Sequence, residues 1–234
     1  MFRFKQFNVD QTGCAMKINT DGVLLGALTE ADQPKTILDI GTGTGVIALM
    51  LAQRFAGAQI DAVEIDAIAA ETAKRNFEGS PFADRLQLYA DGFEEYMNKH
   101  PERKYDLIVS NPPFYINSLE SPGAKKNLAK HTDQYFFEVL IETVAKHLVV
   151  FGSFWVILPL ETAQLVKVIA VEYGLNLKQA INVLSYPDSE PHREILVFTL
   201  GNEKELDEWF VIYKEPKVYS QQYREALTPF FTIF

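Results

Sequence analysis

Residues 36–45 read Thr36-Ile37-Leu38-Asp39-Ile40-Gly41-Thr42-Gly43-Thr44-Gly45, a short apolar run that ends in three alternating glycines. The run is typical of a buried strand, and residues 46–55, which follow at once, have the apolar pattern of a helix packed on a sheet. Glycines permit a tight turn and close approach of a ligand to the backbone. Ligands of open α/β sheets lie beyond the carboxyl ends of the strands. The stretch therefore predicts a strand, a ligand-binding loop and a helix.

The spacing within this loop indicates the kind of ligand. Gly41, Gly43 and Gly45 form G-x-G-x-G, which differs from the G-x-G-x-x-G of dinucleotide binders and lacks the Gly-Lys-Ser/Thr of a P-loop. Asp39 precedes the glycines, where a carboxylate would repel a phosphate. A cationic ligand suits the loop better than a phosphorylated one.

Outward from the loop, short apolar runs alternate with helical patterns over residues 36–200. The alternation predicts an α/β fold with a mostly parallel sheet and helices on both faces. Residues 177–185 and 194–200 read as two strands without a helix between them, which predicts an antiparallel edge strand. We expect one domain over residues 1–234, with an N-terminal extension (1–28) and a C-terminal tail (201–234) that docks on the core.

Composition limits the classes of function. The 234 residues include 22 Lys and Arg against 31 Asp and Glu, and this net charge of -9 argues against nucleic-acid binding through bulk charge, though not against a local basic patch. The single cysteine, Cys14, cannot form an intrachain disulfide, which favours a reducing compartment. No signal peptide or apolar run of about 20 residues is present, so a cytoplasmic protein is expected.

Two acidic residues mark the ends of the next two predicted strands, Glu64 as the last residue of one and Asp91 just after the other. Glu64 is placed to accept both hydroxyls of a ribose, and Asp91 to accept from the amino group of an adenine. Ile65 or Phe93 would lie against the ring. The alternative is a plain tight turn with helix N-caps at Asp66 and Asp91.

A rigid loop, Asn111-Pro112-Pro113-Phe114, follows the fourth predicted strand. The side-chain oxygen of Asn111 and the carbonyl oxygen of Pro112 could both accept from one amino group. Phe114 could stack on a planar base. The alternative is a proline turn that ends the strand, with Phe114 in the core.

These motifs together resemble a known family. The glycine loop with Asp39, the two strand-end acids and the Asn-Pro-Pro-Phe loop are similar to the Rossmann-like S-adenosylmethionine methyltransferases that modify amino nitrogens, over about residues 36–200. Residues 7–27 resemble the N-terminus of the bacterial tRNA1(Val) adenine N6-methyltransferase family, and Ala129-Lys130-His131 and the aromatic C-terminal tail fit the same family.

The resemblance implies a Rossmann-like methyltransferase fold, S-adenosylmethionine as cofactor and, as substrate, an adenine beside the anticodon of a valine tRNA. It also implies that residues 17–21 form a lid beside the cofactor, with the alternative that Thr20 and Asp21 cap a helix that begins near Gly22. The expected catalytic residues are Asn111, Pro112, Pro113 and Phe114. The expected cofactor-binding residues are Lys17, Thr20, Asp39, Gly41, Gly43, Gly45, Glu64, Ile65, Asp91, Gly92, Phe93 and Asn111.

Basic side chains are the candidate RNA contacts, and the main group of them lies just after the Asn-Pro-Pro-Phe loop. These expected contacts are Lys125, Lys126, Lys130, His131 and Arg193, with Arg3, Lys5 and His192 as weaker candidates. The alternative is a solvated charge run without function.

Other side-chain groups indicate no further chemistry. No cluster has metal-ligand spacing, and we expect no metal, no membrane contact and no obligate protein partner. Tyr135, Phe136 and Phe137 are expected in the core.

Four other readings of the motifs are open. A guanine N2-methyltransferase of ribosomal RNA can share Asn-Pro-Pro-Phe, and a protein glutamine N5-methyltransferase commonly has Tyr where Phe114 stands. A DNA adenine methyltransferase is less favoured, because no target-recognition domain fits in this length. A cofactor-binding sensor or assembly factor would have no use for the intact loop.

Overall fold

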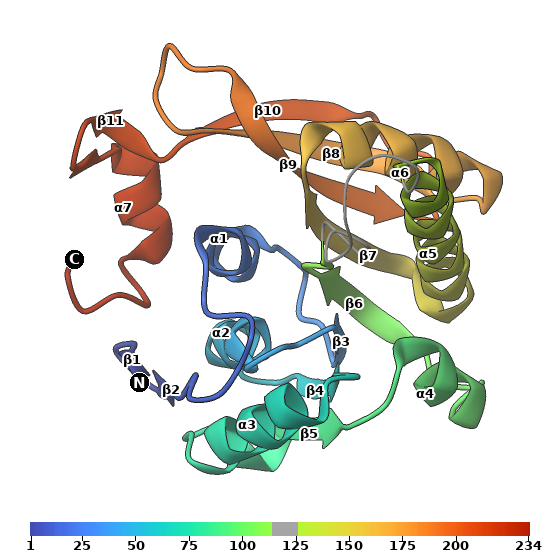
Figure 1. Ribbon diagram of the computed structural model, residues 1–234, viewed down its shortest axis with the longest axis horizontal. Coiled ribbons are helices and arrows are strands. Elements are labelled where there is room, and N and C mark those ends of the chain that lie inside the picture. Colours follow the sequence, from blue (N-terminus) through green and yellow to red (C-terminus); the bar gives the residue numbers. More distant parts are fainter. Residues whose placement is uncertain (114–125) are drawn as a thin grey trace.

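The computed structural model describes residues 1–113 and 126–234, and for residues 126–133 it describes the backbone alone. One eight-stranded sheet forms the centre of the molecule (Figure 1). In spatial order its strands are β10 (Leu206–Val211), β8 (Asn176–Leu184), β9 (Pro191–Thr199), β7 (Leu148–Leu158), β6 (Tyr105–Ser110), β3 (Thr36–Ile40), β4 (Gln59–Val63) and β5 (Leu86–Tyr89).

Most strand pairs of this sheet are parallel, which confirms the predicted α/β class. Only β9 runs against its neighbours, β7 and β8. The predicted position of the antiparallel strand was wrong, because β9 lies inside the sheet and β10 forms the edge in parallel with β8. Strand β10 could not be recognised from the sequence, because it lacks a period-two apolar pattern. Of its six residues four are exposed and only Phe210 is buried.

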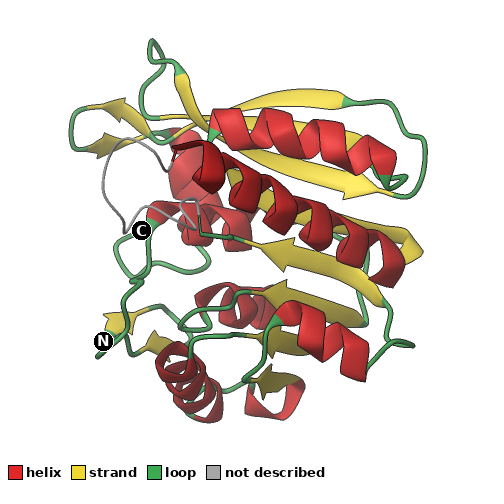
Figure 2. Ribbon diagram, turned by 45° about the vertical axis from the view of Figure 1, so that its right-hand side comes forward, coloured by secondary structure: helices red, strands yellow, loops and turns green. Residues whose placement is uncertain are grey.

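Helices cover both faces of the sheet (Figure 2). One face packs on α1 (Thr20–Leu28), α2 (Val46–Arg54), α3 (Ala67–Glu78) and α7 (Gln221–Leu227), and the other on α4 (Phe93–Lys99), α5 (Lys126–His147) and α6 (Leu160–Glu172). Successive side chains of a strand point to opposite faces, so Ile37 joins the first core and Leu38 the second. Short elements complete the chain: β1 (Phe2–Arg3), β2 (Asn8–Val9), the 3₁₀ helix η1 (Ala83–Arg85), β11 (Tyr213–Glu215) and β12 (Val218–Tyr219).

The two ends of the chain meet beside α1 (Figure 1). Phe4 forms a bridge with Phe231, and the Lys5 ammonium donates to the carbonyl oxygens of Thr228 at 2.6 Å and Phe234 at 3.0 Å. Helix α7 contacts α1 in turn. The N-terminal extension and the C-terminal tail therefore pack on each other as well as on the core.

A partly buried polar cluster fastens α4 to the sheet. The carboxylate of Asp61 on β4 accepts from the hydroxyls of Tyr96 at 2.9 Å and Tyr105 at 2.8 Å, and it also accepts from Arg103. The Arg103 guanidinium lies over the ring of Tyr89 at 5.4 Å. These contacts hold the helix that begins at Phe93 in a fixed place at the sheet edge.

Candidate active site

The glycine loop leaves the carboxyl end of β3 in left-handed backbone conformations. Gly41, Gly43 and Gly45 have φ angles of 71°, 58° and 85°, which L side chains rarely adopt. A Cβ at Gly41 or Gly43 would meet no atom within 4 Å, so the backbone here borders open space. A Cβ at Gly45 would lie 2.4 Å from a ring carbon of Phe77, so this glycine permits helix packing. Gly41 and Gly43 line the cavity described below, whereas Gly45 does not.

Asp39 braces the loop from beneath. Its Oδ2 accepts from the Thr42 hydroxyl at 2.6 Å and from the Ala48 backbone N–H at 3.1 Å, and its side chain is completely buried. Its Oδ1 has no hydrogen-bond partner among the described residues. Asp39 is not among the residues that line the cavity, although its neighbour Ile40 is. The structure thus places this carboxylate under the loop rather than in contact with the space for a ligand.

The stability of the ligand-free protein is expected to depend on Asp39 and pH. Burial raises the pKa of Asp39 from 3.8 to about 7, while the hydrogen bonds from Thr42 and Ala48 lower it in part. Between these pH values the unfolded chain releases the Asp39 proton, whereas the folded protein keeps it. The stabilisation that comes from this difference in proton binding is therefore complete below pH 4 and is lost as pH rises to 7. Over this range wild type should lose on the order of 4 kcal/mol relative to Asp39→Asn in urea unfolding. Parallel pH profiles for the two proteins would contradict the raised pKa.

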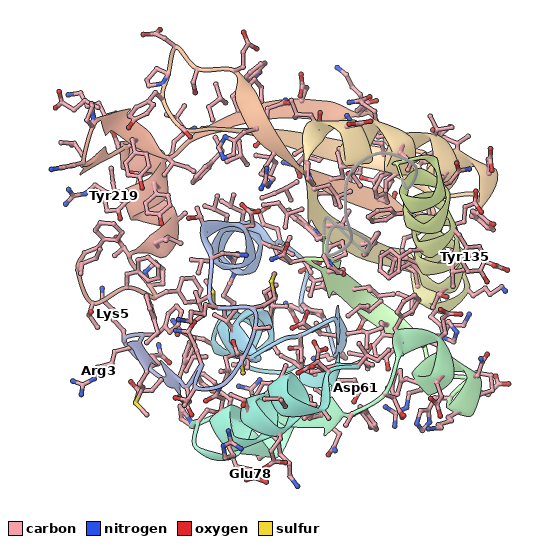
Figure 3. All side chains as sticks on the ribbon, viewed as in Figure 1. Arg3, Lys5, Asp61, Glu78, Tyr135 and Tyr219 are labelled. Atoms are coloured by element: carbon pink, nitrogen blue, oxygen red, sulfur yellow. The ribbon has the colours of Figure 1, made fainter. Side chains whose placement is uncertain are left out.

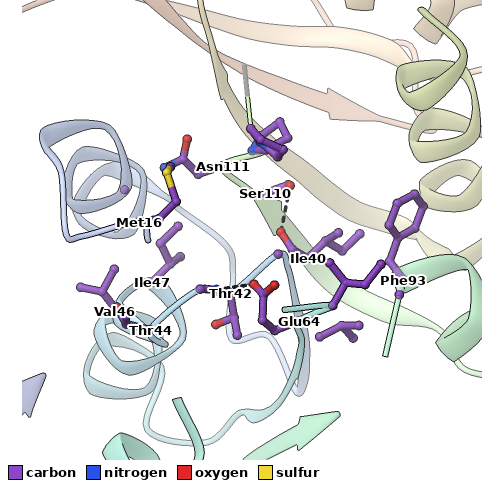
Figure 4. Close-up of a pocket in the computed structure, with 18 of the residues that line it drawn as sticks. Met16, Ile40, Thr42, Thr44, Val46, Ile47, Glu64, Phe93, Ser110 and Asn111 are labelled. Carbon is purple, nitrogen blue, oxygen red and sulfur yellow. Dashed lines mark hydrogen bonds between the residues drawn. The ribbon is translucent and has the colours of Figure 1, made fainter. Parts of the chain in front are cut away.

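Glu64 directly follows β4 and joins the glycine loop to the start of α3. Its Oε2 accepts from the Gly43 N–H and its Oε1 from the Asp66 N–H, both at 2.8 Å. The residue is 9% exposed and lines the cavity (Figure 4). Each carboxylate oxygen has a second lone pair, so the pair of oxygens can still accept from two adjacent hydroxyls.

The side chains after β4 and β5 form one wall of the cavity. Asp91 lines it and accepts from Lys99 at 3.1 Å, while the N-cap of α4 is Gly92 and not Asp91. Ile65 is 80% exposed at the rim, and Phe93 packs edge-on against Phe136 with ring centroids 5.8 Å apart. The N-cap alternative therefore holds for Asp66, which accepts from the Ala69 N–H at 2.7 Å, and fails for Asp91.

Asn111, Pro112 and Pro113 follow β6 and line the same cavity. The preceding Ser110 donates to the carbonyl oxygen of Ile40 at 2.9 Å, which ties the end of β6 to the end of β3 (Figure 4). The first turn of α1 passes close by, because a Cβ at Gly22 would lie 3.5 Å from the amide nitrogen of Asn111. Phe114 lies outside the described residues.

The N-terminal extension reaches the cavity just before α1. Lys17 lines the cavity, whereas Thr20 is exposed and lines a neighbouring groove. The alternative that Thr20 and Asp21 cap a helix beginning near Gly22 was wrong by one to two positions: α1 begins at Thr20, and Asn19 caps it by accepting from the Gly22 N–H at 2.9 Å. The cap position favours Asn as strongly as Asp, so local sequence did not discriminate between these neighbours.

Asp21 fastens the first turn of α1 to the start of β9. Its carboxylate accepts from Arg193 at 2.8 Å, and the two side chains are only 13% and 27% exposed. Arg193, a candidate RNA contact, is thus engaged in an ion pair 172 residues away along the chain. The side chains of the other RNA candidates, Lys125, Lys126, Lys130 and His131, lie outside the described residues.

Arg193→Ala is expected to lower the free energy of unfolding by about 1–3 kcal/mol, because it leaves the sheltered Asp21 carboxylate without this partner. Urea denaturation measures the loss, and Asp21→Asn combined with Arg193→Gln should recover part of it. The control is Lys178→Ala, which breaks the ion pair between Lys178 and Glu203. These two side chains are 40% and 51% exposed, so the loss should lower the free energy of unfolding by less than about 1 kcal/mol. Equal losses for the two alanine variants would disprove a special role for the sheltered pair.

These residues surround a cavity of about 410 Å³, within the usual range for small-molecule sites. Sequence reasoning missed several lining residues that come from other segments, among them Met16, Ile18, Asn19 and Phe136. Phe136 was assigned to the core, as was Tyr135, which is 64% exposed (Figure 3); only Phe137 is buried as predicted. No local pattern separates these three rings, because the turn of α5 decides which one faces the cavity. Ile18 and Asn19, by contrast, could have been inferred from their neighbour Lys17.

The described residues contain no group of three or more His, Cys, Asp or Glu side chains placed to hold a metal ion. Within the same part of the chain, no helix has the length and apolar character needed to cross a bilayer.

Comparison with known proteins agrees with this geometry. A family model described as "Methyltransferase small domain" matches residues 18–163. The sheet, the loop and this match define a methyltransferase that uses S-adenosylmethionine. This chain is 48% identical to a protein from Pedobacter heparinus named tRNA1(Val) (adenine(37)-N6)-methyltransferase, over 100% of this chain and 98% of that one. It is 44% identical to a protein of the same name from Flavobacterium psychrophilum, over 95% of each chain. The chain belongs to this tRNA1(Val) (adenine(37)-N6)-methyltransferase family.

Solved structures support the fold independently. A predicted O-methyltransferase from Agrobacterium tumefaciens superposes with a TM-score of 0.66 at 15% identity, over 90% of this chain and 96% of that chain. A methyltransferase from Pyrococcus furiosus gives a TM-score of 0.56 at 20% identity, over 82% and 91%. At these identities the likeness confirms the predicted Rossmann-like methyltransferase fold.

Proposed function

We propose that the protein methylates the exocyclic N6 amino group of adenine 37 in tRNA1(Val), with S-adenosylmethionine as the methyl donor. One observation carries the proposal: Asn111 and Pro112 line the same cavity as the glycine loop and Glu64. A pair of acceptors for a planar amine and a cradle for a nucleoside therefore share one space. The names of the full-length relatives support the choice of RNA substrate.

The cavity residues fit the cofactor. Glu64 would accept from the ribose hydroxyls, and Asp91 from the adenine amino group, with Ile65 and Phe93 beside the ring. The open space along Gly41 and Gly43, where a Cβ would meet nothing within 4 Å, lets the ligand approach the backbone. When bound, the cofactor supplies an electrophilic methyl group.

Asn111 and Pro112 would orient the target amine. The N6 nitrogen of adenine is a poor nucleophile, because its lone pair is delocalised into the ring. Hydrogen bonds from its two N–H groups to the Asn111 side-chain oxygen and the Pro112 carbonyl oxygen favour a pyramidal nitrogen whose lone pair points at the methyl group. Catalysis then comes from positioning and fixed dipoles.

No strong base is needed for the last step. After transfer the nitrogen carries one methyl group and a positive charge, and it releases its extra proton to water as the lone pair returns. No histidine or cysteine is among the described residues that line the cavity. The acidic residues there, Glu64 and Asp91, have the binding roles given above.

The same proposal assigns the remaining segments. Lys17 and the residues around it would cover the bound cofactor, and Phe114 would stack on the unpaired target base. Lys125, Lys126, Lys130 and His131 would contact the tRNA. The whole chain would act as one domain in the cytoplasm, without an obligate protein partner.

Incubation of the protein with methyl-labelled cofactor and an unmodified tRNA1(Val) transcript, followed by nucleoside analysis, tests the proposal. We expect N6-methyladenosine at position 37 and no product from a transcript with guanine at that position. N2-methylguanosine in ribosomal RNA, or label in protein glutamine, would overturn the proposal in favour of the corresponding alternative.

A further inference from the structure

A second groove opens beside the candidate active site, where the two ends of the chain meet. Arg3, Tyr219, Phe231 and Ile233 are among its lining residues, and its volume is about 370 Å³. Ile18 and Asn19 line both this terminal groove and the active-site cavity. The two spaces are therefore neighbours that share one wall.

The sheet directs the groove to the edge where the active site lies. Strands β8 and β10 run in the same direction as β3 and β6, so their carboxyl ends reach that edge. The hairpin of β11 and β12 follows β10 directly and presents Tyr219 to the groove. A long ligand in the active site would thus meet the groove without turning around the molecule.

A continuous row of aromatic rings begins at Tyr223 and Tyr219, which line the groove, and ends at the surface. Tyr186, Tyr213, Tyr219 and Tyr223 follow one another with ring centroids 5.7, 5.2 and 4.6 Å apart, and Tyr186 at the end of the row is 38% exposed. Aromatic side chains are the usual contact for unstacked bases of single-stranded RNA. The row therefore suits the nucleobases of a loop rather than a duplex.

The charge around the groove is opposite to that of the rest of the protein. Residues 1–19 and 212–234 together contain six Lys and Arg against three Asp and Glu, whereas the other residues contain 16 against 28. Arg3, Lys214 and Lys217 are exposed, and Figure 3 shows Arg3, Lys5 and Tyr219 on the same side of the molecule. A net-negative protein with a basic region at one place directs a polyanion to that place.

We propose that the terminal groove docks the single-stranded RNA that flanks the target base. A neighbouring base enters the groove beside Tyr219 and Ile233, and phosphates contact Arg3, Lys214 and Lys217. The proposal rests on the proposed function for the RNA substrate, and it places the docking surface at the chain ends rather than only at the lysines after the Asn-Pro-Pro-Phe loop. An anionic membrane would match the charge but has no use for a groove that shares a wall with a catalytic cavity.

A charge-matched pair of variants tests the basic rim. The groove variant carries Arg3→Gln, Lys214→Gln and Lys217→Gln, and the control carries the same charge change at exposed positions elsewhere, Lys35→Gln, Lys74→Gln and Lys204→Gln. For the unmodified tRNA1(Val) transcript, the groove variant should raise Kd at least about tenfold and reduce the salt slope by about 2, whereas the control should change Kd less than about threefold. Calorimetry should give both variants the wild-type affinity for S-adenosylmethionine.

A second pair tests the apolar wall with little risk to folding. Ile233→Glu introduces a charge at a groove residue that is 66% exposed, and Val168→Glu introduces the same charge on α6 at 65% exposure. We expect Ile233→Glu to raise the KM for tRNA at least about tenfold with kcat unchanged, and Val168→Glu to leave both near wild type.

The outcomes separate the two proposals. If wild type methylates the tRNA but groove and control variants bind it equally, the groove assignment is overturned and the proposed function stands. If wild type does not methylate the tRNA, the proposed function fails, and unchanged transcript binding by the groove variant would then overturn the groove as well. If the groove variant loses the binding of wild type to phosphatidylserine vesicles but keeps its affinity for RNA, the surface is reassigned to a membrane and the inference is overturned.

Discussion

Replacement of Asn111 by alanine is expected to lower kcat for methyl transfer by about 10²- to 10³-fold, while Kd for S-adenosylmethionine changes no more than a few-fold. The side-chain oxygen is the acceptor that orients the target amine, so its loss removes an interaction that is most valuable in the transition state. The Pro112 carbonyl remains, which is why the expected loss is large but finite. Single-turnover kinetics with saturating tRNA and cofactor measures the chemical step directly.

A matched control for this variant is Asn98→Ala, the same change at an exposed position on α4. Asn98→Ala should retain wild-type kcat. Asn111→Ala with wild-type kcat would show that the amine is held elsewhere. A drop in cofactor affinity that matches the drop in rate would instead assign Asn111 to cofactor binding alone.

Replacement of Glu64 by alanine is expected to raise Kd for S-adenosylmethionine about 10²-fold, because hydrogen bonds to a charged group contribute about 1.5–3 kcal/mol each. The variant removes the acceptor for the ribose hydroxyls and also leaves the Gly43 and Asp66 N–H groups without the partner they have at 2.8 Å. Glu64→Gln keeps one side-chain oxygen, so its Kd for S-adenosylmethionine should lie between those of wild type and Glu64→Ala. Titration calorimetry measures these affinities.

A cofactor analogue that lacks one ribose hydroxyl separates the two effects of Glu64. If the carboxylate binds the ribose, the analogue should bind wild type more weakly than the natural cofactor but bind Glu64→Ala with the same affinity as the natural cofactor. If Glu64 only braces the loop, the missing hydroxyl should weaken binding to both proteins equally. Glu78→Ala, an exposed change at the end of α3, is the control and should leave affinity unchanged.

Local sequence predicted the glycine loop and the acidic strand ends, because their chemistry is carried by a few consecutive residues. Positive φ angles at Gly41 and Gly43 restrict the residue type to glycine, and Glu64 lies one residue beyond its strand. In a parallel sheet the carboxyl ends of neighbouring strands share an edge, so residues that follow β3, β4 and β6 must gather there. The same logic placed Asn111 in the cavity.

Local sequence failed where a side chain is placed by contacts between distant segments. Asp39 was expected to contact the cofactor, but its position on a buried strand turns the carboxylate under the loop, where Thr42 and Ala48 bind it. Strand β10 has too few buried positions for a periodic pattern and is held by its pairing with β8. Neither outcome can be read from neighbouring residues.

By itself, then, the order of residues determined the α/β class, the glycine loop and the Asn-Pro-Pro turn, since each is encoded within a few positions by backbone geometry and apolar spacing. Only the tertiary structure decided that Asp21 pairs with Arg193, that Phe136 rather than Tyr135 reaches the cavity, and that the chain ends form a groove with aromatic walls beside it. Those arrangements join residues far apart in the chain, and they arise from helix rotation and sheet order.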